Sequence, residues 1–160
     1  MCIRDRCNTA HYWHQDIQKK IKIPLLSMPK EVFNYTKKTC KKNTKIGILC
    51  TEATLKTKVY HQYFDNKYDF ISPTKNLQKS SVNKSIKYVK MGKVKEAEKA
   101  LRPAVNQLIK KKCKKIILGC TELPIALFAY KSFKKAKDSK LFIDPNLLLA
   151  HVCMRKYKNN

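Results

Sequence analysis

Short apolar runs alternate with lysine-rich amphipathic segments along most of this chain, and this alternation limits the possible folds more than any other feature. The apolar runs have the length of single strands and cover residues 23–27, 45–51, 68–72, 114–120 and 140–144. The segments between them carry apolar residues at helical spacing and cover residues 10–21, 29–42, 53–65, 93–112, 122–133 and 145–157. Apolar strands that alternate with helices are typical of a parallel sheet covered on both faces. The sequence therefore predicts an α/β fold.

An internal repeat divides this pattern into two similar units. Residues 7–29 and residues 120–145 each begin with a cysteine and a small polar residue, and each continues through a helical segment and a short apolar strand. Each unit ends at a helix start, with an N-cap residue and a proline in the first turn. We therefore expect two similar lobes, each with a parallel sheet flanked by helices.

Charge and composition narrow the classes of function. Lys plus Arg number 36 against 11 Asp plus Glu, a formal net charge of +25, which by itself favours a nucleic-acid or anionic partner. Only four of these residues are arginines, the side chain best suited to reading bases and phosphates, and the lysines are spread over almost every segment. We expect a solvated basic surface and keep a basic nucleic-acid-binding domain as the less favoured alternative.

The cysteines and the longest apolar stretch bear on location. The chain has seven cysteines, an odd number, and none of them forms a C-x-x-C pair, which indicates reduced thiols and a cytoplasmic location. The longest apolar stretch, Ile116 to Tyr130, is interrupted by Glu122 and Pro124 and is shorter than the about 20 residues that cross a membrane. We expect a cytoplasmic protein that does not enter the membrane.

Cys7 and Cys120 stand directly before expected helices, where an α/β fold faces its ligand crevice. The N–H groups at a helix start favour a thiolate and also bind anions. Two thiols on opposite sides of one crevice suit inversion at a carbon atom, because one can remove a proton while the other returns one to the opposite face. Asn8, Thr9 and Thr121 are suited to hold carboxylate oxygens. Burial as a small apolar residue is the simpler role of either cysteine taken alone.

Two other motifs have simple explanations. Thr51 follows an expected strand and suits either a helix cap or a carboxylate donor. Cys7-x3-His11-x2-His14 contains metal-ligating residue types, but no fourth ligand is near in sequence and the spacing matches no zinc module. The chain has only three glycines, too few for a phosphate-binding loop. We therefore expect neither a metal site nor a nucleotide cofactor.

Two motifs together carry a family resemblance. Cys7-Asn8-Thr9-Ala10-His11, followed by Gly119-Cys120-Thr121-Glu122-Leu123, resembles the aspartate/glutamate racemase superfamily and looks closest to its aspartate racemase branch. The resemblance implies a cofactor-independent amino-acid racemase with the substrate between two catalytic cysteines. It implies acid/base roles for Cys7 and Cys120 and carboxylate contacts from four residues: Asn8, Thr9, Thr51 and Thr121. Glu122 and His11 are additional candidates for the site.

The resemblance also implies a substrate class and an assembly. Glutamate racemases usually have histidine at the position of Glu122, so the sequence favours aspartate as the substrate. Related enzymes act on glutamate, hydantoins, maleate or malonates, and these remain alternatives. The resemblance further implies a homodimer.

The residues before Cys7 differ from those before Cys120. Ile116–Leu118 form an apolar run ahead of Cys120, whereas the charged residues 4–6 do not suit a buried strand. We therefore expect the first lobe to be largely missing. In this division residues 1–43 are a remnant of the first lobe, with 1–6 unrelated to it, 44–135 are the second lobe, and 136–160 are a strand and helix that return to the first. We expect the 160-residue chain alone to be poorly stable and inactive.

Overall fold

A four-stranded parallel sheet forms the centre of the protein. The computed structural model of the chain describes residues 2–64, 67–128 and 140–158. The strands are β3 (Lys45–Cys50), β4 (Asp69–Ile71), β5 (Lys115–Gly119) and β6 (Phe142–Ile143), in the order β4-β3-β5-β6. All three pairings are parallel, which confirms the predicted α/β class. Cys50 lies opposite Gly119, so Thr51 and Cys120 leave the same edge of the sheet on neighbouring strands.

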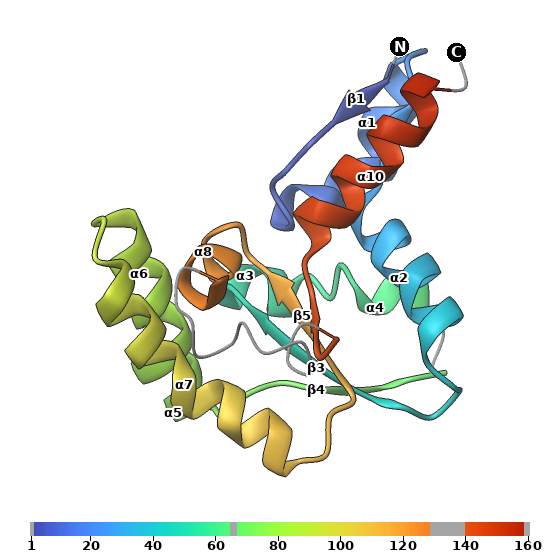
Figure 1. Cartoon of the computed structure of the whole chain (residues 1–160). Helices are drawn as coiled ribbons and strands as arrows, with labels where there is room; N and C mark the ends of the chain where they lie inside the picture. The colour runs from blue at the N-terminus through green and yellow to red at the C-terminus, as the bar shows by residue number, and fades with distance from the viewer. Residues whose placement is uncertain (1, 65–66, 129–139, 159–160) are drawn as a thin grey trace.

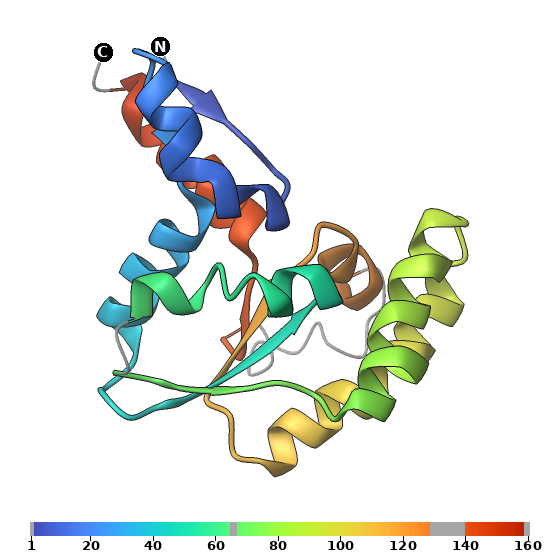
Figure 2. The ribbon, with the colours of Figure 1, turned by 180° about the vertical axis from the view of Figure 1, so that it is seen from behind.

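Helices cover both faces of this sheet (Figures 1 and 2). One face is covered by α5 (Lys75–Leu77), the π-helical segment η2 (Gln78–Asn83), α6 (Lys84–Lys90), α7 (Val94–Lys110) and α8 (Glu122–Phe128). The other is covered by α2 (Met28–Thr39), α3 (Glu52–Lys56) and α4 (His61–Phe64). Successive strand residues alternate between the two cores: Leu49 and Leu118 face one, and Ile48 and Ile117 face the other.

A smaller unit stands on the edge of this layered body (Figure 1). It contains a second parallel pair of strands, β1 (Ile3–Arg4) and β2 (Leu25–Leu26), with η1 (Thr9–Trp13) and α1 (His14–Lys20) between them. The C-terminal helix α10 (Pro145–Lys158) leaves β6 and packs on α2. A separate apolar cluster joins these parts: Leu26, Met28, Leu149 and Val152. Both side chains of β1 are exposed, so this short strand is not a core strand.

The starts of three helices follow from their capping residues. Ser27 Oγ accepts a hydrogen bond from the Lys30 N–H at 3.3 Å, and Asp144 Oδ1 accepts from the Asn146 N–H at 2.9 Å, as predicted for α2 and α10. Thr51 Oγ1 accepts from the Thr54 N–H at 3.2 Å and begins α3.

Within the described ranges, no helix combines the length and apolar character that a bilayer-spanning segment needs.

Two predictions about helices need correction, and a third extends beyond the residues that the structure describes. The helix expected over 53–65 is two short helices, because Lys58 adopts a left-handed φ of 51° between them. Residues 75–90, for which no helix was expected, form α5, η2 and α6. The helix expected over 122–133 is α8 as far as Phe128, and the remainder of that prediction lies outside the described residues.

Candidate active site

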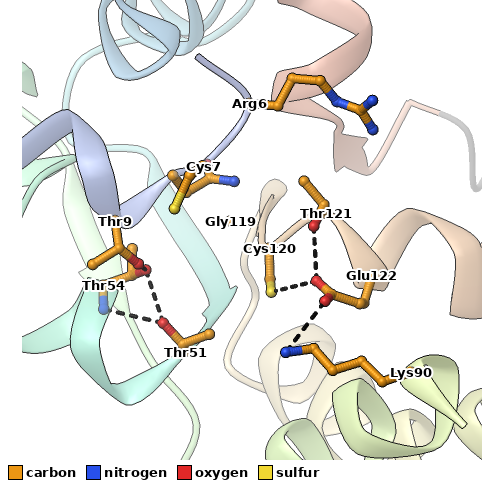
Figure 3. A pocket seen from close by; sticks show the side chains of 11 residues that line it. Arg6, Cys7, Thr9, Thr51, Thr54, Lys90, Gly119, Cys120, Thr121 and Glu122 are labelled. Atoms are coloured by element: carbon orange, nitrogen blue, oxygen red, sulfur yellow. Dashed lines mark hydrogen bonds and ion pairs between the residues drawn. The ribbon is translucent and has the colours of Figure 1, made fainter.

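A cavity of about 500 Å³ lies at the edge of the sheet where β3 and β5 end (Figure 3). Four separate segments line it: the loop before η1, the start of α3, the loop from β5 into α8, and the end of α6. The lining residues are Arg6, Cys7, Asn8, Thr9, Thr51, Thr54, Lys90, Gly119, Cys120, Thr121 and Glu122. The structure thus brings together both cysteines, the four expected carboxylate contacts and Glu122.

The Cys120 thiol holds its proton. It donates a hydrogen bond to Glu122 Oε2 at 3.0 Å, and Thr121 Oγ1 donates to the same oxygen at 2.8 Å. Burial is the largest cause of a shifted pKa at this thiol, and the hydrogen bond and negative charge of Glu122 add to it. Together they raise the pKa of Cys120 to about 12. Cys120 is therefore a neutral, proton-carrying thiol.

Glu122 is the ionised partner of that thiol. Burial works against its negative charge, but the hydrogen bonds from Cys120 and Thr121 outweigh burial and leave the carboxyl pKa below its ordinary value. Lys90 Nζ lies 3.6 Å from Glu122 Oε1 and favours the same charge state. Lys90 comes from the end of α6 and is a cavity residue that the sequence motifs did not indicate.

Cys7 enters the cavity from the other unit and has different surroundings. Its side chain is exposed, and its backbone N–H donates to Asp5 Oδ1 at 2.8 Å. Figure 3 shows the Cys7 and Cys120 side chains reaching the cavity from two different segments. Arg6, beside Cys7, also lines the cavity and adds a positive charge on this side.

His11 is a buried residue that contacts the backbone of Cys7. Its ring is buried, with Nδ1 2.9 Å from the Cys7 carbonyl oxygen and Nε2 accepting from the Met28 N–H at 3.0 Å. The Met28 contact assigns the hydrogen to Nδ1, which then donates to the Cys7 carbonyl. Burial lowers the pKa of His11, in keeping with a neutral ring. His11 is not among the residues that line the cavity, and it contacts the site through the Cys7 backbone.

Three threonine hydroxyls connect the two units. Thr9 Oγ1 lies 2.7 Å from Thr54 Oγ1, which lies 3.0 Å from Thr51 Oγ1. Thr9 belongs to the smaller unit, whereas Thr51 and Thr54 begin the helix after β3. Thr51 is therefore both a helix cap and a wall of the cavity, so the two roles considered for it are compatible.

The arrangement of histidines does not favour the metal motif considered from the sequence. Both ring nitrogens of His11 are bonded to the backbone, and His14 Nε2 lies 2.8 Å from the Leu25 carbonyl oxygen. Across residues 2–64, 67–128 and 140–158, no three His, Cys, Asp or Glu side chains are grouped so that they could hold a metal ion.

Comparisons with known proteins agree with this fold. The profile of the Asp/Glu/hydantoin racemase family matches residues 5–153. The chain is 30% identical over 118 residues to an uncharacterized protein in the pnlA 3′ region of Pectobacterium carotovorum subsp. carotovorum, covering 72% of this chain and 75% of that one. It is 29% identical over 118 residues to a glutamate racemase of Carboxydothermus hydrogenoformans, covering 72% of this chain and 42% of the enzyme.

A comparison with solved structures also finds a racemase with a similar fold. The aspartate racemase of Picrophilus torridus superposes with a TM-score of 0.71 at 27% identity, covering 90% of this chain and 56% of the enzyme. The chain thus spans about half the length of the two racemases. The family profile nonetheless matches this chain almost from end to end, which confirms the resemblance drawn from the two cysteine motifs. The chain belongs to the Asp/Glu/hydantoin racemase family.

Proposed function

We propose that this chain carries the catalytic cleft of a cofactor-independent amino-acid racemase, and that Cys7 and Cys120 exchange the proton at the substrate α-carbon. The observation that supports this most directly is that both thiols line one cavity from two different segments. A thiolate on one side takes the α-proton as an S–H bond forms and the C–H bond breaks. The S–H group on the other side then gives its proton to the opposite face of the carbanion.

The two thiols have different surroundings in the ligand-free cavity. Cys120 carries its proton in the ligand-free cavity, so it is the acid for the enantiomer whose α-hydrogen faces Cys7. For the opposite enantiomer Cys120 must be the base, and Glu122 and Lys90 beside it govern how readily its proton leaves. The proton taken by one sulfur is replaced by the proton given from the other, so each turnover leaves the pair in the reverse protonation state.

The cavity wall supplies donors for the carboxylate groups of the substrate. Hydroxyls of Thr9, Thr51 and Thr121 and the Asn8 amide are suited to the α-carboxylate, whose charge increases as the α-carbon loses its proton. Arg6 adds a positive charge to the cavity lining, whereas the charge of Lys90 faces Glu122 at 3.6 Å. A second carboxylate on the substrate is the natural partner of the Arg6 guanidinium, which favours a dicarboxylic amino acid.

Aspartate is the substrate we propose. The cavity volume of about 500 Å³ lies within the usual range for small-molecule sites. Glu122 stands where the glutamate racemase pattern has histidine, and the similarity to an aspartate racemase points the same way. Glutamate is the alternative, because a glutamate racemase is also among the relatives.

We further propose a cytoplasmic location, since all seven cysteines are free thiols. We propose a homodimer because the family resemblance implies one.

The test is an assay of racemisation without added pyridoxal phosphate, with the protein expressed from the gene that encodes this chain. Loss of optical rotation would be followed with L- and D-aspartate, glutamate and hydantoins. In D₂O, deuterium incorporation at the α-carbon would report proton exchange. We expect aspartate to be racemised and Cys7→Ala or Cys120→Ala to reduce the rate by about 10³-fold or more, because each removes one of the two acid/base groups.

Two results would contradict the proposal. Unchanged racemisation in both alanine variants would exclude the two-thiol mechanism. Rapid turnover of glutamate or a hydantoin, with none of aspartate, would keep the reaction class and exclude the substrate.

A further inference from the structure

One buried tyrosine contacts both cysteine-bearing segments. Tyr60 lies between α3 and α4 and is only 1% exposed. Its hydroxyl donates a hydrogen bond to Asn8 Oδ1, the side chain that follows Cys7. Its ring edge lies against Gly119, the residue before Cys120, where an added Cβ would come within 3.3 Å of Tyr60 Cε2. A single rigid side chain therefore spans the distance between the two halves of the cavity.

The Asn8 amide has one satisfied end and one unsatisfied end. Asn8 lines the cavity and is 4% exposed, and its Oδ1 accepts from Tyr60. Its Nδ2 is buried and has no hydrogen-bond partner among the residues that the structure describes. A buried N–H without a partner is costly, so each such group requires an explanation. An oxygen of a ligand in the cavity would supply the missing acceptor.

The tyrosine decides which end of this amide is available. A phenol hydroxyl has one proton to donate, and burial raises the pKa of Tyr60, which keeps that proton in place. The hydroxyl donates to Oδ1, so turning the amide over would place an NH₂ donor against the hydroxyl proton and leave that proton without its acceptor. The NH₂ group is then the end left for a ligand, which suits a carboxylate acceptor and not a donor.

We propose that Tyr60 is a positioning residue, which orients the Asn8 amide toward the substrate carboxylate and holds the Cys7 segment against the Cys120 segment. This inference rests on the proposed function, because the carboxylate is that of the proposed amino-acid substrate. Tyr60 does not line the cavity, so its effect passes through Asn8 and Gly119.

The test is Tyr60→Phe, which keeps the ring against Gly119 and removes only the hydroxyl. Tyr63→Phe is the matched control, because the Tyr63 hydroxyl bonds Ser27 Oγ at 3.0 Å, also across the two units, and is not a cavity residue. We expect Tyr60→Phe to weaken aspartate binding and raise KM about tenfold, with a smaller change in kcat. Tyr63→Phe should leave both constants unchanged.

A double-mutant cycle separates positioning from a general loss of structure. If Tyr60 acts through Asn8, then Tyr60→Phe should have little further effect on affinity in an Asn8→Ala background. Full additivity of the two losses, or an equal loss in Tyr63→Phe, would overturn the inference.

A spectroscopic measurement makes the inference independent of turnover. In ¹H–¹⁵N spectra of the ligand-free chain, the Asn8 side-chain NH₂ pair can be assigned by its disappearance in Asn8→Ala. We expect Tyr60→Phe to move this pair and Tyr63→Phe to leave it in place. An unmoved pair overturns the inference whatever the protein binds. A moved pair in a protein that binds no amino acid would instead contradict the proposed function and leave Tyr60 as the residue that orients Asn8.

Discussion

Cys120 and Glu122 form a pair in which the carboxylate keeps the thiol protonated. The thiol donates to Glu122 Oε2, and the negative charge beside it disfavours the thiolate. Lys90 partly offsets that charge from 3.6 Å away. The charge state of Glu122 is thus the main local control over when Cys120 releases its proton, apart from burial itself.

Replacing this carboxylate by an amide should lower the pKa of Cys120. Glu122→Gln removes the negative charge but leaves the burial, so the thiol pKa should fall from about 12 without reaching its ordinary value. We expect a decrease of about one pKa unit and, below the pKa, about tenfold faster alkylation of Cys120. The measurement is iodoacetamide labelling against pH, with the Cys120 peptide quantified by mass spectrometry.

Glu52→Gln is the control for this prediction. Glu52 is also the first residue of a helix and accepts a hydrogen bond from Asn83, but it does not line the cavity. Cys120 labelling should be the same in this variant as in the unaltered protein. Slower labelling of Cys120 in Glu122→Gln would show that the carboxylate promotes the thiolate.

The sequence predicted the cavity residues that belong to local motifs and missed those that do not. Cys7 and Cys120 were recognisable because each precedes small polar residues and an expected helix, and Cys120 also follows an apolar strand. Lys90 has no local signal, since it is one of many lysines and reaches the cavity only because α6 packs beside α8. Arg6 belongs to the segment interpreted as unrelated sequence, and it lines the cavity next to Cys7.

The junction of β5 with α8 tolerates no side chain at its last strand residue. A Cβ on Gly119 would lie 2.9 Å from Cys50 Cβ and 3.3 Å from the Tyr60 ring, and neither neighbour has room to move in the core. We expect Gly119→Ala to cost about 1–3 kcal/mol of unfolding free energy and to weaken aspartate binding, because the clash displaces Cys120 and Tyr60. Urea unfolding and calorimetric titration would measure the two effects.

Gly92→Ala distinguishes this clash from an ordinary glycine replacement. Gly92 has φ 72° and nothing within 4 Å of an added Cβ, so alanine there strains only the backbone. We expect a loss of about 1 kcal/mol and unchanged ligand binding. Equal binding in both variants would refute the proposed displacement of Cys120.

Strands were easier to predict than helices in this protein. All the strands of the main sheet lie within the predicted apolar runs, because a buried parallel strand must be apolar on both sides. Residues 75–90 gave no helical signal, because serine, asparagine and lysine interrupt the apolar residues through which η2 and α6 pack on α7. The break between α3 and α4 depends on one left-handed residue, Lys58, which no pattern indicates.

Apolar burial differs strongly between the two units of the protein. The sheet and its helices bury two extensive apolar clusters, whereas the smaller unit relies on four buried residues and a two-stranded sheet. Sheets of two strands are marginal in water, and apolar side chains such as Ile3, Ile17 and Met154 are exposed on this unit. The Cys7 side of the cavity is thus carried by the less stable part of the molecule.

We expect the purified 160-residue chain to show this difference directly. Backbone amides of β1, η1 and α1 should exchange with D₂O at least about tenfold faster than those of β3 and β5, because the smaller unit opens without unfolding the sheet. For the same reason the chain alone should not racemise aspartate. Hydrogen exchange by mass spectrometry and a racemisation assay test the two statements. Racemisation that is lost in Cys7→Ala and Cys120→Ala would contradict the second.

The unequal surroundings of the two cysteines have a thermodynamic consequence. L- and D-aspartate have the same free energy in water, so their equilibrium constant is one. The kcat/KM values of a racemase for the two enantiomers must therefore be equal. In the proposed mechanism one enantiomer nevertheless meets an exposed thiol, and the other meets a thiol bonded to a carboxylate. Any difference in kcat between the enantiomers must then be matched by a proportional difference in KM. A chiral active site can retain one enantiomer longer than the other, but it cannot change the equilibrium ratio of L- to D-aspartate.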